Sequence, residues 1–192
     1  GPISLSFQRG ELLFIVGGNG SGKSTLLKLL TSLYYPHSGE LRLDGAALHR
    51  ETYADYRSLF SPIFGDYYLF EVLYGLRPVD EMRVRTLLRR LEIADKTTVA
   101  NDRFSTTDLS TGQRKRIALL INYLEDRPIQ VFDEWAADQD PQFRRFFYEV
   151  LLAELKAAGK TVIAATHDDR YFHVADRVLR MENGHVEEMP RA

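Results

Sequence analysis

Residues 17–25 read GGNGSGKST and directly follow the apolar run LLFIV of residues 12–16. The nine residues fit the pattern G-x-x-x-x-G-K-[ST], the P-loop that wraps a polyphosphate with backbone N–H groups at the start of a helix. Glycines let that backbone approach the phosphates without a Cβ in the way. The sequence therefore predicts a nucleoside-triphosphate site formed by Gly17, Gly18, Asn19, Gly20, Ser21, Gly22, Lys23, Ser24 and Thr25.

Two acidic residues close a second apolar run and point to metal and water chemistry. Residues 129–132 are followed by Asp133 and Glu134. A carboxylate at the end of a buried strand can hold Mg²⁺ opposite the Ser24 hydroxyl, and a neighbouring carboxylate can orient or deprotonate water. In isolation, such an acidic pair is as often simply the end of a strand as it is a functional site. With a P-loop upstream, we predict Ser24 and Asp133 as metal ligands and Glu134 as a catalytic residue.

The composition excludes several classes of protein. The chain has 192 residues, 44% of them hydrophobic, which favours one domain with one buried core. A net charge of −2 argues against a nucleic-acid partner, and the absence of cysteine excludes a disulfide framework. No apolar run approaches the roughly 18 residues that span a bilayer, so we expect this fragment to be soluble. Its start, Gly1-Pro2, is either a remnant of tag removal or native sequence within a longer protein.

The periodicity of the apolar residues predicts an α/β fold. Alternation predicts a half-buried strand over residues 3–8 and a short strand over residues 41–43, which form a small antiparallel layer. Helical spacing predicts helices over residues 26–32, 53–56, 80–93 and 111–123, and one opening at Asp140-Pro141 with an apolar face of Phe143, Phe146, Phe147, Val150 and Leu151. Between them lie predicted strands at residues 12–16, 59–64, 129–132, 161–165 and 177–181. This alternation of strands and helices favours a mostly parallel sheet covered by helices.

A third motif opens the predicted helix at residues 111–123. Residues 109–113 read LSTGQ, and a serine hydroxyl with glycine backbone amides at a helix start can bind a second anion. Alone, this pentapeptide is also an ordinary helix cap. Its position between the P-loop and Asp133 makes it specific.

In this order of motifs, the sequence resembles the nucleotide-binding domain of ATP-binding cassette (ABC) transporters, whose signature is L-S-G-G-Q. The resemblance covers essentially all 192 residues as a single domain, through GGNGSGKST, a loop near Gly65, LSTGQ, IQVFDE, AADQD and His167. It implies a P-loop NTPase with a RecA-like core at residues 1–64 and 128–192, and a helical subdomain at about residues 65–127. The implied cofactors are ATP and Mg²⁺.

The resemblance also implies roles for residues outside the P-loop. Ser110, Gly112 and Gln113 would touch ATP bound by a second copy of the chain in a head-to-tail dimer. Asp140 would be the aspartate that contacts across this dimer, and His167 would sense the γ-phosphate as a catalytic residue.

Three features depart from the family pattern. The family's glutamine before the aromatic loop falls on Gly65, which makes Asp66 the substitute metal ligand that we predict. The first strand of the family, with the aromatic that stacks on adenine, lies before residue 1. Trp135 replaces a small residue, and residues 133–149, DEWAADQDPQFRRFFYE, resemble exporters of cyclic peptides and peptide siderophores, such as those that secrete pyoverdine or syringomycin.

We therefore expect the ATPase module of an exporter of a peptide-type cargo, driven by ATP-dependent dimerisation at the cytoplasmic face of the bacterial inner membrane. Residues 66–76 would grip a transmembrane half, which is absent from this chain. One alternative is a soluble ABC ATPase that acts on DNA or ribosomes, although the chain has neither a long coiled coil nor a basic excess. Another is an inactive regulator that only binds ATP.

Overall fold

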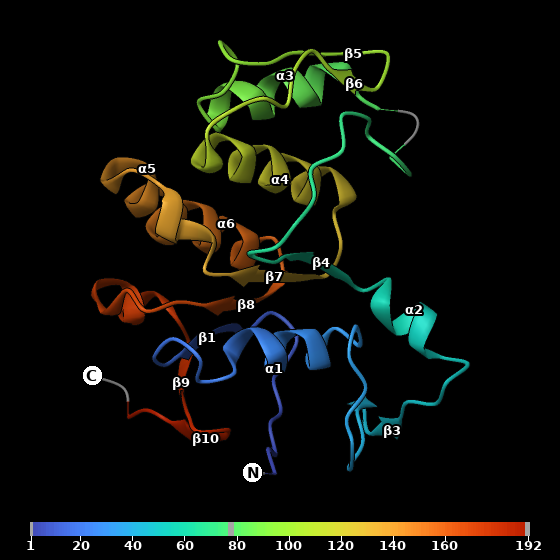
Figure 1. The fold of residues 1–192 in the computed structure, drawn as a ribbon, viewed down its shortest axis with the longest axis vertical. Helices are drawn as coiled ribbons and strands as arrows, with labels where there is room; N and C mark the ends of the chain where they lie inside the picture. Colours follow the sequence, from blue (N-terminus) through green and yellow to red (C-terminus); the bar gives the residue numbers. More distant parts are fainter. Residues whose placement is uncertain (1, 77–78, 191–192) are drawn as a thin grey trace.

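A six-stranded sheet forms the centre of the computed structural model, which describes residues 2–76 and 79–190. Gly1, residues 77–78 and residues 191–192 thus lie outside the described residues. The strand order is β10 (His185–Glu188), β9 (Arg177–Glu182), β1 (Leu12–Val16), β8 (Thr161–Ala165), β7 (Ile129–Asp133) and β4 (Phe60–Ile63) (Figure 1). Every pairing is parallel except that of β10 with β9. The mostly parallel α/β sheet expected from the sequence is confirmed.

The register of the parallel strands brings the predicted motifs to one edge of the sheet. Asp133 at the end of β7 pairs with Ala165 at the end of β8, and Ile15 of β1 also pairs with Ala165. The P-loop leaves β1 at the same edge, because parallel strands share the side on which they end. Ligands bind at this edge in open α/β sheets.

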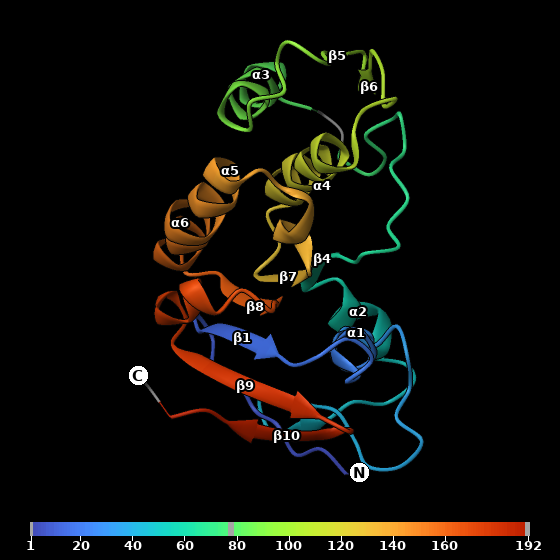
Figure 2. The same cartoon turned by 60° about the vertical axis from the view of Figure 1, so that its left-hand side comes forward.

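The sheet separates two apolar cores, and β1 contributes to both. Leu12, Phe14 and Val16 belong to one core and Leu13 and Ile15 to the other, because successive side chains of a strand point to opposite faces. This is why β1, β7 and β8 are continuous apolar runs. The rotated view in Figure 2 shows helices α1 (Lys23–Leu30) and α2 (Tyr53–Arg57) on one side of the sheet and α5 (Pro141–Phe146) and α6 (Leu152–Ala157) on the other.

A helical layer covers the end of the molecule farthest from β10 (Figure 1). It contains α3 (Glu81–Arg90) and α4 (Thr111–Glu125), with a small hairpin of β5 (Val99–Ala100) and β6 (Arg103–Phe104). Asp80 caps α3 by accepting hydrogen bonds from two backbone N–H groups of its first turn. Val84 and Leu88 are buried, whereas the four arginines of α3 are exposed, as the amphipathic spacing predicts.

The remaining elements are short connections. A two-stranded antiparallel layer joins β2 (Arg42–Leu43) to β3 (Ala46–Ala47). The 3₁₀ helices are η1 (Trp135–Asp138) and η3 (Asp169–Val174), and the π-helical segment η2 (Phe147–Leu151) joins α5 to α6. Within the part of the chain that the structure describes, no helix is both long and apolar enough to cross a bilayer.

Three sequence predictions about elements are wrong in part. Residues 3–8, all of them described, alternate in burial but form no strand, because no neighbouring strand pairs with them. Residues 101–107, over which the sequence predicts no strand, contain β6, and Asn101 and Asp102 adopt positive φ in the turn between β5 and β6. Val150 is exposed rather than on the apolar face, because the wider turn of η2 shifts the residues that face the core.

Candidate functional site

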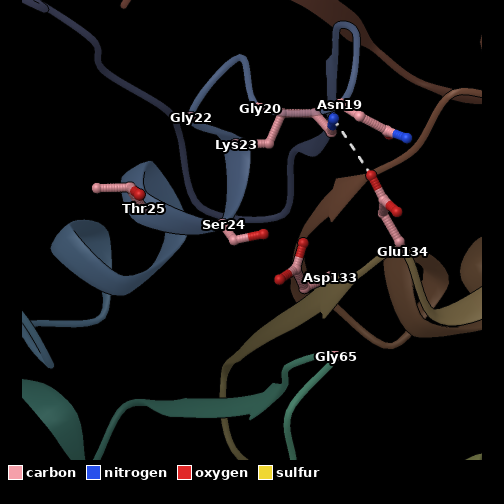
Figure 3. A pocket seen from close by; sticks show the side chains of 9 residues that line it. All are labelled: Asn19, Gly20, Gly22, Lys23, Ser24, Thr25, Gly65, Asp133 and Glu134. Carbon is pink, nitrogen blue, oxygen red and sulfur yellow. Dashed lines mark ion pairs between the residues drawn. The ribbon is translucent and has the colours of Figure 1, made fainter.

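A pocket of about 410 Å³ lies at the edge where the strands end (Figure 3). The P-loop and the start of α1 form one wall, the end of β7 forms the opposite wall, and the loop after β4 closes the floor. The pocket is lined by Asn19, Gly20, Gly22, Lys23, Ser24, Thr25, Gly65, Asp133 and Glu134. The structure therefore brings together the P-loop and the acidic pair that lie more than a hundred residues apart in the sequence.

Glycines shape the P-loop where its backbone passes close to β9. A Cβ built on Gly17, whose φ is +153°, would lie 2.2 Å from the backbone oxygen of Met181. Gly22 has φ +103° and is the residue before α1, with no side chain capping that helix. The first N–H groups of α1 are thus left to a ligand, and the positive end of the helix dipole faces the pocket.

Lys23 is held across the loop to which it belongs. Its side chain is only 5% exposed, and its Nζ donates to the backbone oxygens of Gly17 at 2.9 Å and Gly18 at 3.1 Å. The same Nζ lies 3.2 Å from Oε1 of Glu134, as the dashed line in Figure 3 shows. The ammonium therefore lies between the P-loop backbone and the acidic wall, where an anionic phosphate would meet it.

Asp133 and Ser24 fit a divalent cation. Burial raises the pKa of the Asp133 carboxyl above its ordinary value, although the Ser24 hydroxyl and the Lys23 charge oppose that shift. Oδ1 of Asp133 is buried and has no hydrogen-bond partner among the described residues. An anionic oxygen left without a donor beside a hydroxyl matches the hard oxygen ligands that Mg²⁺ prefers. No group of three or more acidic or histidine side chains suited to a metal occurs in the described part of the chain.

Glu134 adopts a backbone conformation that is unusual for a residue with a Cβ. Its φ of 48° and ψ of 36° are left-handed, its N–H donates to Ala165 at 3.1 Å, and its carbonyl accepts from Nζ of Lys115 at 2.9 Å. Strained backbone of this kind gathers at functional sites. The conformation turns the side chain from the end of β7 toward Lys23.

Several predicted site residues lie outside the pocket lining. The carboxylate of Asp66 pairs with Lys28 at 2.9 Å, and the hydrogen bond from that ammonium lowers the pKa of Asp66. An exposed ion pair of this kind is weak, so the role of Asp66 as a substitute metal ligand stays a prediction. His167 follows β8, is exposed and does not line the pocket, so its contact with a γ-phosphate stays a prediction. Gly17, Gly18 and Ser21 belong to the P-loop without lining the pocket.

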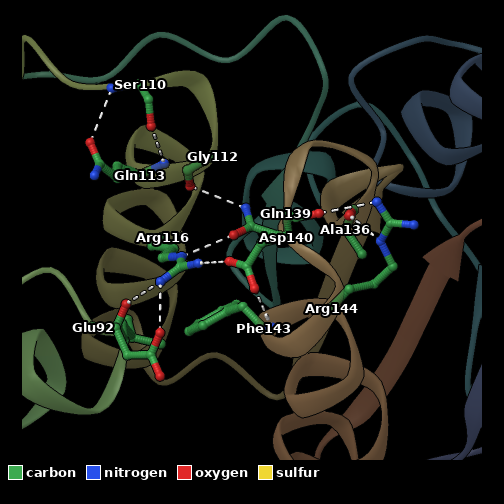
Figure 4. A network of polar contacts seen from close by, with 11 residues as sticks. Glu92, Ser110, Gly112, Gln113, Arg116, Ala136, Gln139, Asp140, Phe143 and Arg144 are labelled. Atoms are coloured by element: carbon green, nitrogen blue, oxygen red, sulfur yellow. Dashed lines mark hydrogen bonds and ion pairs between the residues drawn. The ribbon is translucent and has the colours of Figure 1, made fainter.

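The LSTGQ motif begins α4 at a separate, exposed place (Figure 4). The Ser110 hydroxyl accepts from the N–H of Gln113 at 3.3 Å, while the Gln113 side chain accepts from the N–H of Ser110 at 3.2 Å. These reciprocal bonds define the helix start. A Cβ on Gly112 would lie 2.6 Å from the backbone oxygen of Asp138, so this glycine allows α4 to approach η1.

Asp140 begins α5 in the same network (Figure 4). Its Oδ1 accepts from the N–H of Phe143 at 2.9 Å, and its Oδ2 pairs with Arg116 at 2.6 Å. Both contacts lower the pKa of the Asp140 carboxyl, the backbone hydrogen bond more than the arginine charge. Contact of Asp140 with a second copy of the chain stays a prediction.

Two functional candidates were missed from the sequence, Lys115 and Arg116. Both are buried, and Arg116 reaches Glu92, Gln139 and Asp140 from α4. The sequence places these two basic residues beside the apolar positions of the helix. Lysine and arginine are rarely buried without a partner, so this placement was the signal that the sequence offered. Periodicity alone does not identify those partners.

Comparison with known proteins places this geometry in a family. The family model described as ABC transporter matches residues 1–137. The chain is 51% identical over 188 residues to the ATP-binding protein SyrD of Pseudomonas syringae pv. syringae, which covers 96% of this chain and 33% of the relative. It is 31% identical over 198 residues to the ATP-dependent lipid A-core flippase of Burkholderia pseudomallei (strain 1710b), with 97% and 33% covered. The chain thus spans about a third of the length of these curated relatives.

Solved structures agree on the fold. A bacterial Atm1-family ABC exporter with ATP bound superposes with a TM-score of 0.79 at 24% identity, covering 94% of this chain and 33% of that one. The cbiO1 protein of Clostridium perfringens, part of the ABC transporter complex cbiONQ, gives 0.76 at 28% identity, covering 96% and 78%. With its P-loop pocket and the family match over residues 1–137, this chain belongs to the ABC transporter family and is one of its ATP-binding ATPase domains.

Proposed function

We propose that this chain is the nucleotide-binding domain of an ABC exporter and that it hydrolyses ATP between two copies of itself. One observation carries the proposal. The P-loop, Asp133 and Glu134 line one pocket, while Ser110 and Thr111 at the start of α4 are exposed elsewhere, and no acidic side chain among the described residues pairs with that helix start. Two copies arranged head to tail complete two sites, because each supplies the α4 start that the other's pocket lacks. We also propose the division into a core of residues 1–64 and 128–192 and a helical subdomain of about residues 65–127.

The residues of the pocket have separate tasks in this proposal. The N–H groups of the P-loop and of the first turn of α1 bind the phosphates, and Lys23 leaves Glu134 to neutralise the terminal ones. Ser24 and Asp133 would hold Mg²⁺, which supplies charge neutralisation to the phosphate oxygens when bound. Glu134 accepts a proton from water as the water oxygen bonds to the γ-phosphorus and the bond to the β,γ-bridging oxygen breaks.

The partner copy supplies the second half of each site. Ser110, the N–H group of Gly112 and the side chain of Gln113 face the γ-phosphate, since the start of a helix attracts negative charge. Asp140 stays at the start of α5, and the exposed part of its side chain faces the second copy. His167 contacts the γ-phosphate from the end of β8, a role that rests on the family resemblance.

A second hollow, of about 510 Å³, is where we place the transmembrane half of the exporter. It lies between the end of β4 and α4, and its rim carries three exposed aromatic side chains, Tyr68, Phe70 and Tyr74, at 74%, 56% and 70% exposure. They stack edge to face in series. Exposed aromatic patches of this kind mark protein interfaces, and a partner anchored in the membrane sets the domain at its cytoplasmic face.

The cargo that we propose is of the peptide type, a cyclic peptide or siderophore. This part of the proposal rests on the resemblance of residues 133–149 to exporters of such molecules. Trp135 stands where the family usually has a small residue. Its side chain is fully buried and stacks on Phe147. The change from a small residue to tryptophan therefore alters the packing of the core and not the surface of the domain.

The experiment compares ATP turnover by the purified chain with that of Glu134→Gln, which keeps the shape of the side chain and removes its basicity. We expect turnover to fall at least a hundredfold and the variant to form a dimer in sedimentation runs at saturating Mg·ATP. Lys23→Ala is the matched control and stays monomeric, because it loses the phosphate contact. Equal turnover in wild type and Glu134→Gln would mean that Glu134 is not catalytic, and no turnover in either, with monomers only, would favour an inactive ATP-binding regulator instead.

A further inference from the structure

The backbone of Glu134 is tied down at both of its polar groups. Its N–H donates to Ala165 of β8 at 3.1 Å, and its carbonyl accepts from Ala137 of η1 at 3.3 Å and from Lys115 of α4 at 2.9 Å. The residue is left-handed at φ 48°, a conformation that side chains with a Cβ rarely adopt. Something must therefore hold it there, and Lys115 is the one charged group that bonds to this carbonyl among the contacts of the described residues.

Lys115 is itself fixed from two directions. Its side chain is 5% exposed, and its Nζ lies 2.7 Å from Oδ2 of Asp138, which balances the buried charge. Its own carbonyl accepts from the indole N–H of Trp135 at 3.0 Å. Trp135 in turn stacks on Phe147 with ring centroids 4.4 Å apart and is fully buried. Residues 134 and 135 thus each bond to Lys115, one to its side chain and the other to its backbone.

We propose that Lys115 is a positioning residue, which holds Glu134 in the left-handed conformation that aims its carboxylate into the phosphate pocket. A hydrogen bond from an ammonium is stronger than one from a neutral donor, so it offsets the strain at Glu134 better than Ala137 alone. Lys115 belongs to α4, the helix that starts at Ser110. Within one chain, α4 therefore links the helix start proposed to bind the partner's ATP to Glu134 in the chain's own pocket. The inference rests on the proposed catalytic function of Glu134 and extends it to the residue that orients this carboxylate.

The test is Lys115→Met in the whole chain, since methionine keeps an unbranched apolar stem and removes the ammonium. We expect kcat for ATP to fall about tenfold, the scale of one charged hydrogen bond, while KM for ATP stays within about twofold. KM is spared because the P-loop and Lys23 are untouched. A crystal structure of the variant should show Glu134 outside the left-handed region or its carboxylate turned from Lys23.

Lys156→Met is the matched control, because it also removes an ion-paired lysine. Lys156 pairs with Asp176 away from the pocket, and its loss should leave kcat unchanged. Trp135→Phe is the second variant and decides the matter if Lys115→Met does not fold. It keeps an aromatic ring against Phe147 and removes the donor to Lys115, at the cost of a smaller buried ring, and we expect kcat to fall about threefold with KM unchanged.

The inference is overturned if Lys115→Met, or Trp135→Phe in its place, keeps kcat within about twofold of wild type and Glu134 stays left-handed. Glu134→Gln separates this result from failure of the proposed function. If Glu134→Gln hydrolyses ATP as fast as wild type, Glu134 is not catalytic. The conformation of Glu134 in the Lys115→Met crystal then still decides whether Lys115 positions it.

Discussion

Gly17 is the residue at which the P-loop has least room. Its φ is +153°, and a Cβ at this position would lie only 2.2 Å from the backbone oxygen of Met181, so there is no space for a side chain. Backbone cannot move aside as a flexible side chain can, so we expect Gly17→Ala to lower the free energy of unfolding by about 2–3 kcal/mol. Urea unfolding followed by circular dichroism measures the difference.

Gly18→Ala is the control for this prediction within the same loop. A Cβ on Gly18 meets nothing within 4 Å, so its free energy of unfolding should stay within about 0.5 kcal/mol of wild type. A Gly17→Ala protein as stable as Gly18→Ala would show that the loop and β9 separate more easily than this structure implies.

At the scale of one element, α5 depends on the carboxylate that begins it. The folded pKa of Asp140 is lowered, first by the Phe143 N–H and then by Arg116, so its ionic contribution to stability is present above the unfolded pKa of about 3.9. That contribution is lost as the pH falls through the lowered folded value. We therefore expect Asp140→Ala to cost about 1 kcal/mol at pH 7 and less at pH 3, measured by urea unfolding at both pH values.

Asp140→Asn separates the cap from the charge. Asparagine also caps helices well, so this variant should keep most of the stability at pH 7 and lose the pH dependence of the difference. If the free energies of unfolding of Asp140→Ala and wild type differ by the same amount at pH 7 and at pH 3, ionisation of Asp140 does not stabilise α5.

At the scale of the whole molecule, the aromatic rim of the second hollow predicts a partner surface. Replacing Tyr68, Phe70 and Tyr74 together by serine should change the free energy of unfolding by no more than about 1–2 kcal/mol, because these side chains are exposed and lose only their mutual edge-to-face contacts. The same change should abolish co-purification of the domain with the transmembrane half that we propose, expressed as a separate chain.

Tyr34→Ser with Tyr35→Ser is the matched control, since these tyrosines are exposed but lie outside the hollow. That variant should co-purify as wild type does. Retention of the transmembrane half by the triple variant would move the docking surface elsewhere on the domain.

Much of this architecture was predictable because it depends on local patterns. The apolar runs at residues 12–16, 129–132 and 161–165 are strands because their side chains are buried on both faces of the sheet. The turn at Asn183 and Gly184 joins β9 to β10 because both residues tolerate positive φ. The strand expected over residues 3–8 failed because a strand also needs a partner, which alternation of side chains does not supply.

The candidate site was predictable only in part, because its contacts join distant residues. The acidic pair and the P-loop met as expected, since parallel strands end at one edge of the sheet. Asp66, however, pairs with Lys28, which lies 38 positions away, and Lys115 bonds to Glu134 across 19 positions. Nothing in the local pattern of either residue specifies those partners.

The sequence by itself determined the P-loop, the strands of the sheet and the starts of α4 and α5, because glycine spacing, apolar period and capping residues act over a few neighbouring positions. Only the tertiary structure decided which charges face each other. It buried Lys115 against Glu134 and Asp138, left Oδ1 of Asp133 without a hydrogen-bond donor among the residues that the structure describes, and paired Asp66 with Lys28. The physical reason is that a charge in a low-dielectric interior interacts with whatever packing brings near it, and packing depends on the whole chain.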